Sequence, residues 1–216
     1  KDFEATHVRP QRLMKTLFTD EAYVKANVDE ARLMRRLFDL ACNMQSHDTD
    51  MQLYSLFTDE ECYDLWSCNN LYWYLTHACS PVTDGLMPYR EADLLRNILD
   101  RADAALKEGK NQATLRFGHE SCLLPLVALL ELNHYGESYP DVEKLSEQWR
   151  AYDIFPMASN VQFVFFHKKG SNDVLVKVLL NEKETKLPVK TDVAPYYHWK
   201  DVESYYREKL DKYQHI

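Results

Sequence analysis

The residues with the clearest chemical potential are the neighbours His119 and Glu120, in the stretch 113–126, ATLRFGHESCLLPL. A histidine can donate a charge-assisted hydrogen bond to an anion, and a glutamic acid can hand a proton to a leaving group. The pair therefore predicts a site where an anionic substrate binds and acid catalysis takes place. The alternative is an ordinary surface turn, because His-Glu dipeptides are common.

Sequence signals for a strand and a helix flank the His-Glu pair. Polar and apolar residues alternate over residues 114–117, which predicts a short buried strand, and Gly118 permits a sharp turn after it. Residues 123–132 predict an apolar helix that Ser121 would cap, with Pro125 in its first turn. The pair would then stand between the carboxyl end of a strand and the amino end of a helix, where α/β folds bind ligands and anions.

The rest of the chain separates into a helical part and a mixed part. Apolar residues recur at helical spacing in several segments. Besides 123–132, the predicted helices are 29–41, 62–75, 93–107, 142–152 and 199–210. Residues 1–90 carry helix signals only, whereas 161–166 and 174–180 predict two strands of a hairpin around a polar loop.

Composition limits the partners and cofactors of this chain of 216 residues and 25.5 kDa. Its formal net charge of −8 argues against a nucleic-acid partner, although a local basic pocket could still hold a polyphosphate. No apolar run reaches the roughly 18 residues of a membrane-spanning helix. The five cysteines include no Cys-x-x-Cys pair, so zinc spacing is missing, and Cys122 is expected to be a small core residue. We expect neither a metal nor another cofactor.

Three motifs resemble the histidine acid phosphatases, and within that family the multiple inositol polyphosphate phosphatases. Residues 118–126, GHESCLLPL, are similar to the second active-site motif, which in that branch usually reads Gly-His-Ala-Glu-Thr-x-Leu-Pro-Leu. Residues 154–160 resemble its Pro-x-Ala-Ser-Asn segment, and residues 178–183 resemble its Leu-Leu-Asn-Glu strand end. The motifs occur in the family's order, and the resemblance runs from about residue 20 to near the C-terminus. Asn160 either shapes the site or ends a turn.

The resemblance implies a phosphomonoester hydrolase, an acid phosphatase acting on inositol phosphates such as phytate through a phosphohistidine intermediate. It implies that His119 is the second histidine of the site, contacting the phosphoryl group, and that Glu120 is the proton donor. Glu120 directly follows His119, as the aspartate does in the His-Asp members, and glutamate adds one methylene of reach. The resemblance implies no metal and a periplasmic or secreted location.

The implied fold is an α/β phosphatase core similar to that of phosphoglycerate mutase, with an inserted helical subdomain. We assign residues 1–90 to the helical subdomain and residues 91–216 to the C-terminal part of the core. The chain itself is expected to be mostly α-helical with a few strands. These predicted strands are too few to build a parallel core sheet.

The family's nucleophile is a histidine in an Arg-His-Gly-x-Arg motif, and this sequence contains no Arg-His-Gly. The nearest candidate, THVRP at residues 6–10, has no glycine and no arginine before its histidine. We therefore expect the nucleophile to lie on an N-terminal part of the same protein, and the isolated chain to be inactive. The alternative is a non-catalytic protein of the same fold that binds a phosphate ligand or a partner.

Overall fold

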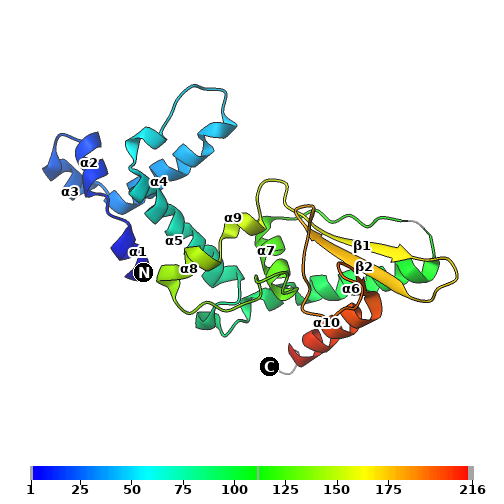
Figure 1. The fold of residues 1–216 in the computed structure, drawn as a ribbon. Helices are drawn as coiled ribbons and strands as arrows, with labels where there is room; N and C mark the ends of the chain where they lie inside the picture. The colour runs from blue at the N-terminus through cyan, green and yellow to red at the C-terminus, as the bar shows by residue number, and fades with distance from the viewer. Residues whose placement is uncertain (1, 111, 214–216) are drawn as a thin grey trace. The chain divides into compact units, whose positions relative to one another are not determined.

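The computed structural model describes residues 2–110 and 112–213, and it contains two compact units that divide between Tyr72 and Trp73 (Figure 1). The first unit is helical throughout its described part. Its elements are α1 (Asp2–His7), α2 (Gln11–Leu17), α3 (Glu21–Asn27), α4 (Glu30–Asn43), η1 (Met44–Ser46), η2 (Tyr54–Leu56) and most of α5 (Asp59–His77). The functional division at residue 90 stays a prediction.

Local capping interactions explain where the helices of the first unit begin. The Asp29 carboxylate accepts a hydrogen bond from the backbone N–H of Arg32 at 3.1 Å and caps α4. At α5, Thr58 and Glu61 form a reciprocal capping box, with bonds of 3.0 and 3.2 Å between each backbone N–H and the other side chain. Arg12 on α2 also binds the Glu61 carboxylate, with Nε 2.7 Å from Oε1, so one glutamate both starts α5 and holds α2.

The second unit combines short helices, three long helices and a small sheet. Its helices are η3 (Pro81–Thr83), η4 (Met87–Glu91), α6 (Ala92–Glu108), α7 (Glu120–Leu129), η5 (Val142–Lys144), α8 (Leu145–Gln148), α9 (Ala151–Ile154) and α10 (Trp199–Tyr213). Its strands are β1 (Val161–His167), β2 (Val174–Leu180), β3 (Lys183–Glu184) and β4 (Tyr197–His198). The chain is therefore mostly helical with a few strands, as predicted.

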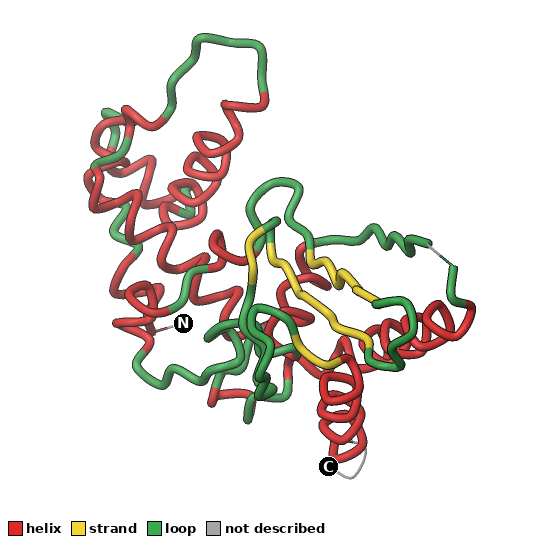
Figure 2. The backbone as a smooth tube through the Cα atoms, turned by 45° about the vertical axis from the view of Figure 1, so that its right-hand side comes forward, coloured by secondary structure: helices red, strands yellow, loops and turns green. Residues whose placement is uncertain are grey.

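The sheet is antiparallel and is organised around β2, which pairs with β1, β3 and β4 (Figure 2). The predicted hairpin is confirmed, with Phe163 opposite Val178. Val176 and Val178 point to the buried face, where α10 packs against β2 and α6. Arg207 of α10 secures that packing with ion pairs to the α6 carboxylates Asp100 and Asp103, at 2.9 and 2.8 Å.

Two asparagines fasten the start of β1 to the end of β2. The backbone N–H of Asn160 donates to the Asn181 side chain at 3.1 Å, and the Asn181 N–H donates to the Asn160 carbonyl at 2.9 Å. The Asn181 amide also donates to the Ile154 carbonyl at 3.1 Å. The two family-like segments that contain these residues therefore meet in space, and Asn160 closes a hairpin there.

The helices predicted at 29–41, 62–75, 93–107 and 199–210 are confirmed as α4, α5, α6 and α10. The single helix predicted over 142–152 was wrong, because the helix is interrupted at Trp149. The backbone of Trp149 is extended, with φ of −140° and ψ of 129°. That conformation places the Trp149 ring in the core, 5.2 Å from the Tyr74 ring in an edge-to-face contact. Burial of one large aromatic ring outweighed helix propensity here.

His198 joins two loops of the sheet through ion pairs with two aspartates, and we call this arrangement the His198 clasp. Its Nδ1 lies 3.0 Å from Asp173 Oδ2 in the β1–β2 loop, and its Nε2 lies 2.9 Å from Asp192 Oδ1 in the segment before β4. The hydrogen bonds to Asp173 and then to Asp192 raise the pKa of His198 above its ordinary value of 6.5.

The clasp predicts a pH dependence of stability in the second unit. Because the pKa of His198 is raised on folding, its stabilising effect is complete below 6.5 and is lost as the pH rises through the folded-state value. The free energy of unfolding of the unaltered chain should decrease as the pH rises from about 6 to about 8. We expect this decrease to be smaller in the His198→Asn variant. Urea unfolding at both pH values measures this, with the exposed His134→Asn as control. Equal pH dependence in all three proteins would contradict the clasp.

Candidate functional site

The segment that leads to the His-Glu pair is a loop in this structure. The buried strand predicted at 114–117 was wrong, since Leu115 is 75% exposed and Phe117 is 94% exposed. Arg116 anchors the loop to α6 through a hydrogen bond of 2.7 Å from its Nη2 to Asn97 Oδ1. A strand needs a neighbouring strand for its backbone and a core for its apolar side chains. Among the described residues, neither is in place at this segment.

The apolar helix after the pair is present, but it begins earlier than predicted. His119 occupies the N-cap position of α7 with extended φ and ψ of −110° and 164°, and Glu120 is the first helical residue. Ser121 therefore lies inside the first turn and is not the cap, and Pro125 lies inside the helix beyond its first turn. Cys122 is exposed, so its predicted place in the core was also wrong.

The His119 and Glu120 side chains are both exposed at the amino end of α7. The His119 carbonyl accepts the N–H groups of Cys122 and Leu123, at 3.0 and 3.1 Å, so the backbone at the pair is already fixed by the helix. The first N–H groups of a helix have no partner within it, and its dipole is positive at this end. Both properties favour an anion beside the pair.

His77, at the end of α5, lies within electrostatic reach of Glu120 of the pair and of Arg90 on η4. His77 is buried, its Nδ1 lies 2.7 Å from Thr76 Oγ1, and its ring centroid lies 4.7 Å from that of Trp73. Burial lowers the pKa of His77, the positive charge of Arg90 lowers it further, and the negative charge of Glu120 opposes both. The side chains of Arg90 and Glu120 are thus both within electrostatic reach of one imidazole.

η4, which carries Arg90, packs against α7, whose amino end carries the pair. Burial raises the pKa of the adjoining Glu91, while Arg90 and a hydrogen bond with Cys122 of α7 act in the opposite direction. We call His77, Arg90, His119 and Glu120 the α7 site. It combines an exposed cation, two imidazoles and one carboxyl group, which suits binding of an anion and transfer of a proton.

The sequence indicated only half of the α7 site. His77 and Arg90 come from the end of one helix and from a short 3₁₀ helix, far from the pair along the chain. No motif spacing connects them to His119. The fold of the second unit brings the charges of Arg90 and Glu120 within reach of the His77 imidazole.

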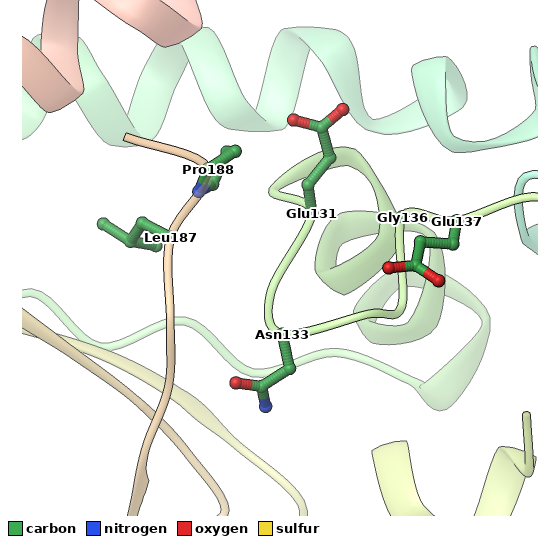
Figure 3. Close-up of a pocket in the computed structure, with 6 residues that line it drawn as sticks. All are labelled: Glu131, Asn133, Gly136, Glu137, Leu187 and Pro188. Carbon is green, nitrogen blue, oxygen red and sulfur yellow. The ribbon is translucent and has the colours of Figure 1, made fainter. Parts of the chain in front are cut away.

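A cavity of about 160 Å³ lies elsewhere in the second unit, at the connection after α7 (Figure 3). It is lined by Glu131, Asn133, Gly136, Glu137, Leu187 and Pro188. Its charged side chains are two carboxylates, which repel a phosphate, so this cavity does not extend the α7 site. Among the residues that the structure describes, no group of three or more His, Cys, Asp or Glu could hold a metal ion, and no described helix is long and apolar enough to cross a membrane.

Comparisons with known proteins agree on one family. The model of the histidine phosphatase superfamily (branch 2) matches residues 5–181. Human multiple inositol polyphosphate phosphatase 1 is 28% identical over 134 residues, which are 56% of this chain and 27% of the human protein.

Solved structures of a Bifidobacterium longum multiple inositol polyphosphate phosphatase share the fold. The complex with phosphate has a TM-score of 0.70 and 22% identity over 84% of this chain, and the complex with inositol hexasulfate has 0.66 and 22% over 82%. This chain covers 40% and 38% of those two chains. The phosphatase fold implied by the motifs is therefore confirmed, and the chain spans well under half the length of these relatives.

The α7 site predicts opposite effects of two substitutions on the pKa of His77. Arg90→Gln removes a charge that lowers this pKa and should raise it, whereas Glu120→Gln removes a charge that raises it and should lower it. Titration of the His77 imidazole followed by NMR measures both shifts. Arg101→Gln, an exposed charge on α6, is the control and should leave the pKa unchanged. Shifts of the same sign in the first two variants would contradict the site.

Proposed function

This chain belongs to the histidine phosphatase superfamily. From that premise we propose that it supplies the proton donor and a phosphate-binding histidine to a phosphatase active site for inositol polyphosphates such as phytate. The observation that carries the proposal is the exposed His119-Glu120 pair at the amino end of α7. Support for the substrate class comes from the similar proteins, which are multiple inositol polyphosphate phosphatases, one of them solved with inositol hexasulfate.

In the proposed reaction His119 binds the phosphoryl group that is transferred. Phosphoryl transfer spreads negative charge over the equatorial oxygens, and a protonated histidine beside free helix N–H groups neutralises it. We assign a supporting role to Arg90 on η4, which packs on α7, because its positive charge would attract a substrate that carries several phosphates. Glu120 donates a proton to the leaving oxygen, because an inositol alkoxide is a poor leaving group at neutral pH.

The proposed active site also needs a histidine nucleophile, which we place on an N-terminal part of the same protein. A histidine nitrogen there forms a bond to phosphorus while the bond from phosphorus to the inositol oxygen breaks, and Glu120 protonates that oxygen. Water then attacks the phosphohistidine, Glu120 accepts the proton, and phosphate leaves. His7, in the nearest candidate motif, instead binds the Phe3 carbonyl through Nδ1 at 2.8 Å. We further propose that the isolated chain is inactive, and that the whole protein is secreted or periplasmic.

One observation favours a second candidate function. This sequence contains no Arg-His-Gly, so a relative that binds a phosphorylated ligand without cleaving it would have the same α7 site. The full product of the gene that encodes this chain distinguishes the two functions.

Glu120→Gln in the full gene product should lower the rate of phosphate release from phytate by about 10²–10⁴-fold, because it removes the proton donor and keeps the side-chain size. Glu108→Gln, an exposed change at the far end of α6, should leave the rate unaltered. Release of inorganic phosphate at acidic pH is the measurement.

An inactive full product that still binds inositol hexasulfate would establish the binding function instead. Phosphate release by the 216-residue chain alone, at a rate comparable to the full product, would contradict the proposed place of the nucleophile.

A further inference from the structure

Glu91 stands at the start of a long helix without capping it. It is the last residue of η4 and occupies the N-cap position of α6, yet its side chain makes no capping hydrogen bond with that helix. Short polar residues are usual at an N-cap, because their side chains reach the first N–H groups. The Glu91 carboxyl group instead hydrogen-bonds with Cys122 of α7. Its side chain is therefore tied to a neighbouring helix and not to its own.

Cys122 connects this carboxyl group to the His-Glu pair. It lies in the first turn of α7, two residues after Glu120, and its backbone N–H donates to the His119 carbonyl at 3.0 Å. The contact is part of the wider packing of η4 on α7. Glu91 is therefore held by the same helical turn that carries the proposed proton donor.

Glu91 and Arg90 are neighbours whose combined charge depends on pH. Arg90 is exposed and an arginine stays charged throughout, whereas Glu91 is half-buried and can be ionised or neutral. Burial raises the pKa of Glu91, and the Arg90 charge and the Cys122 hydrogen bond oppose that shift. Because the pKa stays above the ordinary value of 4.5, Glu91 gains its proton at a higher pH than an exposed glutamate does. The two charges cancel near neutral pH and leave one positive charge in acid.

The other elements packed on η4 also carry charged groups. α6 has Asp93 in its first turn, and its side chain is exposed. Lys209 of α10 lies over the Tyr89 ring of η4, with Nζ 5.9 Å from the ring centroid. α7 adds the exposed His-Glu pair. Solvent screens exposed charges, so we base the behaviour of Glu91 on its burial and its two direct neighbours in charge and hydrogen bonding.

We propose that Glu91 sets how strongly the α7 site binds a polyanionic ligand. Its ionised carboxylate offsets the Arg90 charge, and its protonated form leaves that charge to attract the ligand. Binding would then tighten as the pH falls from neutral to acidic, in step with protonation of Glu91. The inference rests on the proposed function, which places an inositol polyphosphate beside His119.

Binding of inositol hexasulfate to the full gene product tests this inference without requiring catalysis. Sulfate esters stay ionised in mild acid, so the charge of this probe does not change with pH. We expect Glu91→Gln to bind it at least about 5-fold more tightly than the unaltered protein does at about pH 7.5, and equally tightly at about pH 4, because the glutamine resembles a protonated carboxyl group at every pH. Isothermal titration calorimetry measures both affinities.

Glu108→Gln is the matched control, because it removes the same charge from the exposed far end of α6 and should change either affinity by less than about 2-fold. Equal affinities of Glu91→Gln and the unaltered protein at both pH values would overturn the inference. An equal gain for Glu91→Gln at both pH values would also overturn it, since the gain would not follow protonation.

Cys122→Ala provides a second test that a merely structural role of Glu91 would not satisfy. It removes a hydrogen bond that lowers the pKa of Glu91, so binding of the probe should tighten at a higher pH than in the unaltered protein. An unchanged midpoint would contradict the inference. The predicted pH dependence in a full product that releases no phosphate would support the inference and reject the proposed function. Phosphate release from phytate without this pH dependence would do the reverse.

Discussion

The second unit depends on how the buried end of α7 satisfies its backbone. Residues 124–130 are buried without interruption, so the last carbonyl groups of this helix have no access to water. Two side chains of α10 reach them: Tyr206 Oη donates to the Leu130 carbonyl at 2.8 Å, and Lys209 Nζ donates to the Leu129 carbonyl at 2.7 Å. A buried carbonyl without a partner costs about 1–3 kcal/mol, and the lysine charge also suits the negative end of the helix dipole.

The two ends of α7 have different roles: the carboxyl end is held in the core, and the amino end carries the proposed acid pair. One end is fixed by α10, which in turn is held to α6 by Arg207 and to the sheet by β2. The other end presents His119 and Glu120 to solvent. A helix that is apolar on all sides can be held rigidly in a core, and the residues at its exposed end then inherit that rigidity. Small movements of the proposed acid pair are limited by packing that lies ten residues away.

Local signals in the sequence were sufficient for most of the helices and for the hairpin. Asp29, the Thr58–Glu61 box and Gly109, which ends α6 with φ of 64°, act within one helical turn, and each marks a helix end in the structure. Errors arose where a distant contact decides. The extended backbone at Trp149 accompanies a ring contact with Tyr74, and in the part of the chain that the structure describes no strand pairs with the segment 114–117.

The α7 site shows the same limit. His119 and Glu120 could be read from the sequence because a motif and a helix start coincide there. His77 and Arg90 could not, because the electrostatic effect of Arg90 and Glu120 on His77 arises from the tertiary fold within the second unit. Family resemblance supplied the chemistry of the pair, and the structure supplied its surroundings.

The mutual hydrogen bonds of Asn160 and Asn181 bear on how this family can be recognised. These amides close the hairpin of β1 and β2 and contact no residue of the α7 site in the described contacts. Their hydrogen bonds join the two ends of the hairpin and involve none of the reactive groups of the α7 site. The segments around the two asparagines therefore belong to the architecture of the hairpin, and the proposed activity rests on the histidine and its acid alone.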